Sequence, residues 1–249
     1  MEEQSLEIWR NANFKRIDAR LVTFQRTHNC QSESTYLDAY GPSCYLFVCK
    51  NPPKSLAINH KGQWQKPQGA IAIYIPPFSI VEWKLPKCHF SWEGFNFSQP
   101  QEGLPKQAVY FSWQKEFQIN STQEFINTLK SIAKFYPGYK EDTHNLEAIK
   151  IKEFIDNHFQ KEFGLEELAK TMAMSRAKLT RIFRKSYDLS PIEYKNRVRI
   201  FYTIQKMLEQ SSIITELTFD SGFNDSSNFN RKFKSLIGEK PSVFNWQKK

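Results

Sequence analysis

The sequence has little cysteine and no long uninterrupted hydrophobic run. Its four cysteines all lie in the first hundred residues of a 249-residue chain. The longest apolar stretches, such as Ala70–Phe78 with its two prolines, are too short to cross a bilayer, which argues against a membrane-spanning helix. The first residues lack a basic segment followed by an apolar one, so no secretory signal is expected. Reduced thiols in the cytoplasm are the simplest expectation.

The charge of the chain is positive and unevenly distributed. The formal net charge is +9 and the pI is about 9.3, which favours a polyanionic partner. Residues 145–249 hold 19 Lys and Arg against 13 Asp and Glu. Within Arg176–Arg199, eight cations are opposed only by Asp188 and Glu193. This stretch is therefore the expected centre of a polyanion-binding surface.

Short apolar or alternating runs separated by Gly and Pro indicate β-structure from residue 10 to about residue 118. The runs are Leu21–Phe24, Cys44–Cys49, Ala70–Ile75, Ile80–Trp83, Phe90–Phe97 and Ala108–Trp113. Six or more short strands at close spacing predict a sandwich, a jelly roll or a small barrel.

A helical period replaces the alternation between Ser121 and Tyr136. The apolar stripe of this predicted helix contains Phe125, Leu129, Ile132 and Tyr136. Such a stripe is either buried on its own domain or paired with a second protomer, and we expect dimerisation. Pro137-Gly138 predicts the end of the helix, and the polar residues 139–143 predict a linker.

Everything after about Asn145 shows a helical period. Asn145–Gln160 places Leu146 and Ile155 near one face of a first helix. Further on, Ser190, Pro191 and Glu193 have the order of a capping box with proline at the first helical position. The helix that they begin is expected to run to about Gln210, a length of roughly 30 Å.

One motif occurs twice in this helical part, Arg-x-Phe-(Arg/Lys)-x6-Pro-x-x-(Tyr/Phe). The first copy is Arg181, Phe183, Arg184, Pro191 and Tyr194, and the second is Arg231, Phe233, Lys234, Pro241 and Phe244. A motif repeated at a fixed offset, here fifty residues, indicates one supersecondary unit used twice. Each unit is predicted to be a short helix, a turn and a basic helix.

The outward faces of the two basic helices suit the major groove of DNA. At 100° per residue the phenylalanines point inward and leave polar residues outside. The expected base-reading residues are Ala177, Thr180, Arg181 and Arg184 of the first helix and Ser227, Asn230, Arg231 and Lys234 of the second. The expected phosphate contacts are Arg176, Lys178, Lys185, Ser226 and Lys232. Arg pairs with guanine and Asn with adenine in that groove. The alternative is that these are solvated faces of a helical bundle.

Residues 145–249 resemble the DNA-binding domain of the AraC/XylS family of bacterial transcription regulators. The most specific stretch is residues 221–234, SGFNDSSNFNRKFK, followed by Gly238 and by Pro241–Phe244. The resemblance implies an all-α domain with two helix-turn-helix units joined by a long helix, bound to successive major grooves of double-stranded DNA. Thr218, Asp188 and Lys240 depart from the family pattern, and they put in doubt how tightly the second unit packs.

The resemblance also implies a role for the N-terminal half. It predicts a cupin-like jelly roll over residues 1–120 that senses a small-molecule effector, dimerises, or both. Residues 121–144 would be a dimerisation-type helix with a linker, and residues 145–249 the DNA-binding domain. The whole is then an α+β multidomain regulator, an activator by family habit, with RNA polymerase and a second copy of the chain as partners.

Catalysis and cofactors are not expected. The N-terminal half has no His-x-His pair for a cupin metal centre, so a cupin-type enzyme with a basic helical interaction module is only the rival interpretation. A metal- or redox-responsive regulator is a second alternative. Its ligands would be His28, Cys30, Cys88 and His89, which suit zinc, or its redox pair would be Cys44 and Cys49. The favoured interpretation is that free cysteines pack as small apolar residues.

Overall fold

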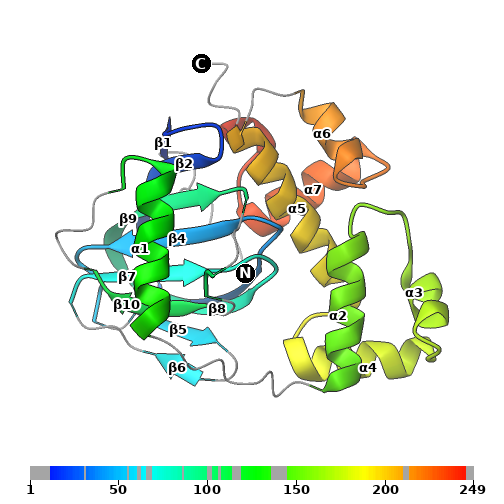
Figure 1. Cartoon of the computed structure of the whole chain (residues 1–249). Coiled ribbons are helices and arrows are strands. Elements are labelled where there is room, and N and C mark those ends of the chain that lie inside the picture. Colours follow the sequence, from blue (N-terminus) through cyan, green and yellow to red (C-terminus); the bar gives the residue numbers. More distant parts are fainter. Residues whose placement is uncertain are drawn as a thin grey trace.

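The computed structural model separates the chain into a β-rich N-terminal half and a helical C-terminal half (Figure 1). The described residues are 12–30, 32–54, 56–60, 63–65, 69–85, 87–99, 103–105, 108–113, 119–135, 145–209 and 213–244. The expected linker and Tyr136 lie outside these ranges. No helix within them is long and apolar enough to cross a membrane.

The N-terminal half is built from two antiparallel sheets. The strands are β1 (Asn13–Arg16), β2 (Leu21–Cys30), β3 (Ser34–Ala39), β4 (Cys44–Cys49), β5 (Ala57–His60), β6 (Gln63–Gln65), β7 (Ile71–Ile75), β8 (Ile80–Leu85), β9 (Cys88–Phe97) and β10 (Val109–Ser112). Six strands form one sheet in the order β1-β2-β9-β4-β7-β10, and four form the other in the order β3-β8-β5-β6. The sheets share a core in which Phe47 meets Trp83 edge to face, with ring centroids 6.0 Å apart. The predicted β-rich architecture is confirmed.

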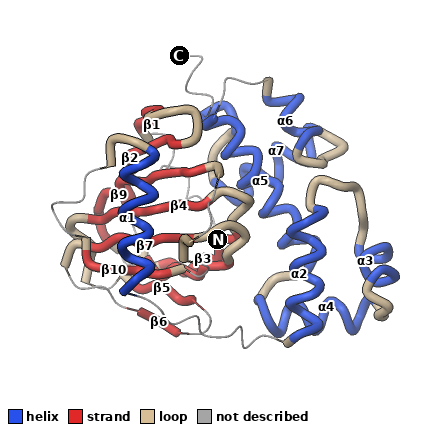
Figure 2. The backbone as a smooth tube through the Cα atoms, in the orientation of Figure 1, coloured by secondary structure: helices blue, strands red, loops and turns tan. Residues whose placement is uncertain are grey.

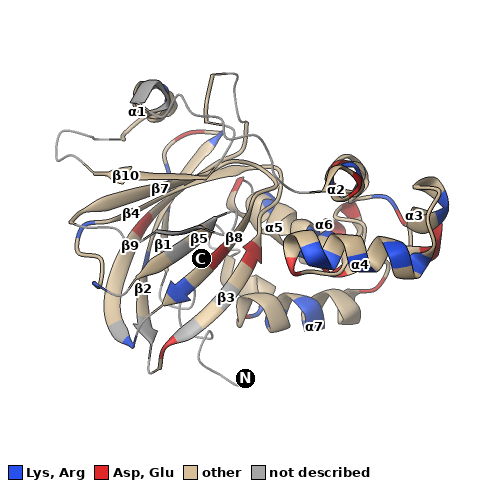
Figure 3. Ribbon diagram, turned by 90° about the horizontal axis from the view of Figure 1, so that it is seen from below, with Lys and Arg blue, Asp and Glu red and all other residues tan. Residues whose placement is uncertain are grey.

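Strands β4 and β7 are buried along their whole length, because both of their faces are covered. One face contributes to the core between the sheets. Helix α1 (Thr122–Phe135) lies across the other face (Figures 1 and 3). Phe125 of α1 packs against Phe95 and Phe97 of β9, at centroid distances of 6.2 and 5.2 Å.

This packing overturns the dimerisation expected of the α1 stripe. Phe125, Leu129 and Ile132 are all buried in the cluster beneath α1. Side chains in that position are unavailable to a second protomer. A helical period shows that a face is buried without showing what covers it, and here the cover is the chain's own sheet.

The strands themselves extend further than the sequence pattern predicts. Strands β2 and β9 pair over ten residues, from Leu21 opposite Phe97 to Cys30 opposite Cys88. The predicted runs Leu21–Phe24 and Phe90–Phe97 fall inside them. The polar second half of β2 was not expected to be a strand, because its alternation of polar with charged residues resembles a loop.

The C-terminal half is helical throughout its regular structure (Figure 2). Its elements are α2 (Leu146–His158), α3 (Leu165–Thr171), α4 (Arg176–Tyr187), α5 (Pro191–Glu209), α6 (Ile214–Asp220), α7 (Ser226–Ile237) and the short 3-10 helix η1 (Pro241–Phe244). This confirms an all-α domain in which two helix-turn-helix units, α3–α4 and α6–α7, are joined by the long helix α5. One detail is wrong: Leu146, expected near the buried face of α2, is 75 % exposed.

Helix α5 also packs against the β-rich half. Its Phe201 lies beside Tyr40 and Tyr45, with ring centroids 4.7 and 6.3 Å away. At Gly41 the two backbones approach so closely that a Cβ would lie 3.0 Å from the amide nitrogen of Tyr202. Glycine in the predicted Gly41-Pro42 turn therefore also allows the two halves to touch.

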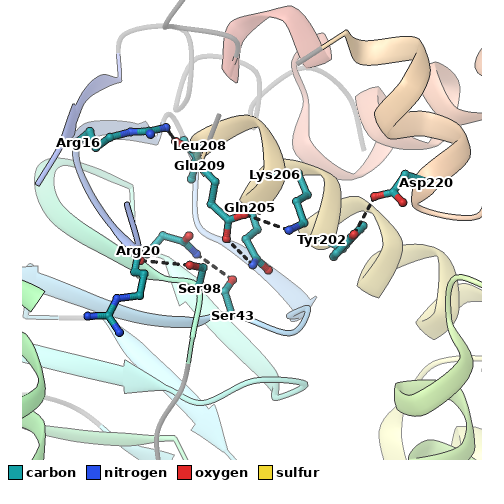
Figure 4. Close-up of polar contacts among 11 residues, drawn as sticks. Arg16, Arg20, Ser43, Ser98, Tyr202, Gln205, Lys206, Leu208, Glu209 and Asp220 are labelled. Carbon is teal, nitrogen blue, oxygen red and sulfur yellow. Dashed lines mark hydrogen bonds and ion pairs between the residues drawn. The ribbon is translucent and has the colours of Figure 1, made fainter. Parts of the chain in front are cut away.

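A second group of contacts lies near the end of α5. Arg16 of β1 donates to the carbonyl of Leu208 at 3.2 Å (Figure 4). Close by, Phe14 packs on Phe244 of η1 with a centroid distance of 6.0 Å. The helix that joins the two helix-turn-helix units is therefore held by the β-rich half in its middle and near its C-terminal end.

Candidate nucleic-acid interface

Helix α4 is defined by local signals at both of its ends. Ser175 caps the N-terminus by accepting a hydrogen bond from the backbone of Lys178 at 3.2 Å. Asp188 ends the helix in the left-handed conformation, with φ of 55°, and its amide donates to Arg184. Between the caps, Leu179 and Phe183 are fully buried, so the opposite face of α4 is turned outward.

Helix α7 follows the same plan with different capping residues. Asp225 accepts from the backbones of Ser227 and Asn228, at 2.9 and 2.7 Å. Gly238 ends the helix with φ of 81°. Phe229 and Phe233 are fully buried, and their rings lie 5.5 Å apart. The inward positions expected from the helical period are confirmed in both helices.

The expected base-reading side chains lie on the open faces of α4 and α7. Thr180 is half-buried, whereas the other seven are exposed: Ala177, Arg181, Arg184, Ser227, Asn230, Arg231 and Lys234. Arg231 donates to Asn228 at 3.2 Å, which orients its guanidinium along the helix surface. Within the described ranges, Arg181 and Arg184 take part in no ion pair. Free, fully charged guanidinium groups are suited to phosphates and to guanine.

The expected phosphate contacts flank these side chains, and two of them have acidic partners. Lys178 pairs with Glu147 of α2 at 2.7 Å, and Arg176 lies 3.8 Å from Glu166 of α3. Exposed pairs of this kind contribute only about 0–1 kcal/mol, so a polyanion can replace the carboxylate. The remaining three are Lys185, which is exposed, and Ser226 and Lys232, which are half-buried.

Three of the eight cations between Arg176 and Arg199 have a structural role that their spacing did not reveal. Lys195 donates to the carbonyl of Phe163, and Arg199 donates to those of Phe159 and Lys161. Burial lowers the pKa of Lys195 to about 8 and that of Arg199 to about 10. These cations satisfy carbonyl groups at and beyond the end of α2, where positive charge is favoured.

The third inward cation, Arg197, links the two halves of the protein. It donates to the carbonyl of Leu37 in β3 and pairs with Glu193 at 3.2 Å. Its charge opposes the rise that burial causes in the pKa of Asp38. The basic surface open to a polyanion is therefore narrower than the sequence indicates. Figure 3 shows it along α4 and α7.

Polar contacts between loops fix the two helix-turn-helix units relative to each other. Gln160, after α2, donates to the carbonyl of Asp220 at 2.9 Å. The carboxylate of Asp220 accepts from Tyr202 at 2.8 Å (Figure 4). Asn224 donates to Glu162 at 2.6 Å. With α5 between them, the outward faces of α4 and α7 are presented by one rigid frame.

The departures from the family pattern are accommodated locally. The hydroxyl of Thr218 is fully buried and donates to the carbonyl of Ile214, one turn earlier in α6, at 2.9 Å. A buried hydroxyl with a partner carries little cost, so the second unit packs normally around Thr218. Asp188 takes up the left-handed conformation that its short polar side chain tolerates.

The four residues considered for a metal do not form one site. His28 is fully buried between the sheets, whereas His89 is exposed. Residues of opposite parity on paired strands point to opposite faces of the sheet, which separates these two imidazoles. The Cys44–Cys49 redox pair is also wrong. The two cysteines lie on opposite faces at the two ends of β4, roughly 16 Å apart at the rise of a strand.

Comparisons with known proteins agree with this geometry. Residues 168–246 match a family described as "Helix-turn-helix domain". The chain is 36% identical to the Msm operon regulatory protein of Streptococcus mutans over 95 residues, 38% of this chain and 34% of that protein. It is 29% identical to the lactose operon transcription activator of Staphylococcus xylosus over 91 residues, 35% of this chain and 33% of that protein. Each match thus spans about a third of the relative's length.

One solved structure is similar over nearly the whole chain. It is ToxT from Vibrio cholerae O395, with a TM-score of 0.56 and 16% sequence identity over 92% of this chain and 98% of that one. At this identity the likeness concerns the fold alone. It supports the layout of a β-rich half followed by a helical half.

Proposed function

Because the C-terminal part of the chain is a helix-turn-helix domain of the AraC/XylS type, we propose that the protein regulates transcription by binding a specific double-stranded DNA site. The relatives that share this domain are transcription regulators rather than enzymes. The observation that carries the proposal is the pair of exposed, polar faces of α4 and α7 on one rigid frame.

The spacing of the two helices supports recognition of one side of a duplex. Helix α5 has 19 residues, and at 1.5 Å per residue it is roughly 28 Å long. Successive major grooves on one side of B-DNA are about 34 Å apart. With the contribution of the flanking turns, α4 and α7 suit neighbouring grooves. One protomer then contacts about two turns of DNA, and the bound site is asymmetric.

The roles of the side chains follow from exposure and chemistry. Arg181 and Arg231 occupy the same position of the repeated motif, and we assign guanine recognition to both. Asn230 suits adenine. Lys178, Lys185 and Lys232 neutralise phosphates, so the affinity falls steeply as the salt concentration rises. We assign the remaining candidates the roles predicted from the sequence: base contacts for Ala177, Thr180, Arg184, Ser227 and Lys234, and phosphate contacts for Arg176 and Ser226.

The β-rich half, in this proposal, adjusts DNA binding through α5. Phe201 and Arg197 of α5 both contact that half, so a small-molecule effector or a second protomer bound there changes the frame that carries α4 and α7. We further propose activation through RNA polymerase, since one relative is named as an operon's transcription activator. We assign dimerisation to a surface other than the buried stripe of α1.

The test is selection of binding sites from random duplex DNA by the full chain. A truncated helical half is unsuitable, because removing the β-rich half would expose the apolar surface around Phe201. We expect one asymmetric site of about two turns with two conserved blocks. The matched variant replaces Arg181 and Arg231 with Ala and should lose the blocks while keeping salt-dependent binding. Recovery of no sequence by the unaltered chain would refute the proposal.

A further inference from the structure

The two arginines assigned to guanine are held differently in the two units. In α7, Nη2 of Arg231 donates to the side-chain oxygen of Asn228 at 3.2 Å. In α4, the side chain of Arg181 forms no hydrogen bond or ion pair with any described residue. Because the two arginines occupy the same position of the repeated motif, the first unit serves as an internal comparison for the second.

A single difference between the repeats accounts for this. Asn228 and Lys178 occupy equivalent positions in the two units, each three residues before the arginine. Side chains three residues apart on a helix are neighbours on its surface. The amide oxygen of asparagine accepts a hydrogen bond, whereas lysine carries donors only and repels a guanidinium group. Lys178 pairs instead with Glu147 of α2 at 2.7 Å.

The acceptor in α7 is held in a defined position. Asn228 lies in the first turn of the helix, where its backbone amide donates to the capping carboxylate of Asp225 at 2.7 Å. The next residue, Phe229, is fully buried, so this turn is fixed against the core of the second unit. Asn228 itself is half-buried, and its short side chain has less rotamer freedom than that of arginine. The less mobile partner therefore sets the position of the more mobile one.

We propose that Asn228 is a positioning residue, which holds Arg231 for base recognition and thereby sharpens the sequence preference of the second unit. This inference rests on the proposed recognition of DNA by α4 and α7. The hydrogen bond draws the guanidinium back over the first turn of α7, and in helix-turn-helix domains the N-terminal residues of the recognition helix contact the base edges. The bond occupies one of five N–H donors, which leaves the others for O6 and N7 of guanine.

The difference between the units concerns base preference rather than overall affinity. An arginine without a partner can turn to a phosphate, and phosphate contacts carry no sequence information. Such an arginine also loses more rotamer freedom when it is fixed on a base. Since Asn228 is uncharged, its hydrogen bond adds nothing to the salt dependence that phosphate contacts cause. We therefore expect the base contacted by Arg231 to be read more strictly than the base contacted by Arg181.

The first experiment measures binding of the full chain to single-base variants of its selected site. Arg231→Ala identifies the base that Arg231 reads. At that base, Asn228→Ala should reduce discrimination about 3- to 10-fold and leave the salt slope unchanged. Asn228→Asp keeps the acceptor and should retain the discrimination within about twofold, although its carboxylate weakens binding to every sequence. In the Arg231→Ala background, Asn228→Ala should have no further effect at that base.

The second experiment transfers the acceptor to the first unit. Lys178→Asn and Lys178→Ala remove the same charge, but only Lys178→Asn supplies an acceptor for Arg181. At the base read by Arg181, Lys178→Asn should discriminate about threefold or more better than Lys178→Ala, with equal salt slopes.

Three results would overturn the proposal. The two Lys178 variants could discriminate equally, Asn228→Asp could lose as much discrimination as Asn228→Ala, or Asn228→Ala could act at a base that Arg231→Ala leaves unchanged. If Arg231→Ala alters the preference at no base, the base-reading role itself fails, and the positioning role fails with it.

Discussion

The two helix-turn-helix units carry the same motif, but they are packed on different neighbours. In the first unit, Phe183 lies against Tyr194 of α5, with centroids 5.6 Å apart, in a cluster that draws on helices α2 to α5 and reaches the β-rich half at Ala39 of β3. In the second, Phe233 contacts Phe244 at 5.7 Å, and Phe244 contacts Phe14 of β1 at 6.0 Å. The aromatic core of the second unit is thereby continuous with the core between the sheets. A repeated motif therefore determines the structure of each unit but not the elements against which the unit packs.

The turns of the two units differ for a related reason. Ala173 in the first turn and Gly222 in the second both have positive φ, at 52° and 91°. Ala173 is exposed, so its Cβ lies in solvent. A Cβ on Gly222 would lie 2.2 Å from the carbonyl oxygen of Gln160. Only the turn that contacts the segment after α2 requires glycine.

The largest expected effect comes from deleting one aromatic ring in each unit. Phe233→Ala and Phe183→Ala should each lower the free energy of unfolding by about 3–5 kcal/mol. Phe233 belongs to the cluster that contains Trp83 and Trp92, whereas the cluster around Phe183 holds no described tryptophan. The loss of Phe233 should therefore shift tryptophan fluorescence and helical circular dichroism together in urea. Phe183→Ala should affect mainly the helical signal. Identical shifts of both signals in both variants would contradict the difference in packing.

The second-largest difference between the two units is expected in the stability cost of substitutions in their turns. Gly222→Ala should cost about 2–3 kcal/mol, because the Cβ meets a backbone oxygen and the residue keeps a positive φ. Ala173→Gly, the matched change in the first turn, should stay within about 1 kcal/mol. Thermal unfolding followed by circular dichroism measures both. A harmless Gly222→Ala would show that the second turn does not contact the backbone of Gln160 after α2.

The base-reading arginines test whether the units contribute equally to recognition. Arg181→Ala and Arg231→Ala should each reduce the affinity for the selected site by about 1–3 kcal/mol. Each should relax the base preference in only one of two blocks about one helical turn apart. Binding assays on a panel of single-base variants of the site measure this. An unchanged base preference in both variants would contradict the assignment of Arg181 and Arg231 as base-reading residues.

Replacing the N-cap residues should reveal a smaller difference in stability between the two units. The unit whose cap accepts more hydrogen bonds should lose more. Ser175→Ala and Asp225→Ala should each cost about 1 kcal/mol, with the larger loss at Asp225, which caps two backbone amides rather than one. Urea unfolding of the two variants gives the values. Asp225→Asn, which can still accept one of these bonds, is the control and should recover most of the loss.

The smallest effect is expected at the phosphate contacts. Lys178→Ala and Lys185→Ala should weaken binding to all sequences alike and lower the slope of affinity against salt by about one each. The Lys178 loss should be the smaller, since that side chain must first leave Glu147. Titrations at several salt concentrations measure the slopes. A change in base preference would reassign either lysine to the bases.

Much of the helical half could be predicted because its signals are local. The capping role of Ser190 toward Glu193, the left-handed Asp188 and the inward phenylalanines each depend on residues within one or two turns. The base-reading candidates followed from the same periodicity, and seven of the eight are exposed, whereas Thr180 is half-buried. In the β-rich half, the sequence pattern did not predict strands β1, β3, β5 and β6. A short or polar strand has no clear residue pattern of its own and is defined by its hydrogen bonds to a neighbouring strand.

The sequence by itself determined that the chain contains two capped helix-turn-helix units joined by a long helix, since caps, turns and helical period act within a few residues. Tertiary structure alone decided which residues those elements cover. In the sequence, Lys195 and Arg199 are helical cations like Arg181, although they are buried in the structure. Likewise, the apolar stripe of α1 resembles a dimer contact in the sequence, although the chain's own sheet covers it. Burial is a property of what packs against a residue, and those partners come from distant parts of the chain.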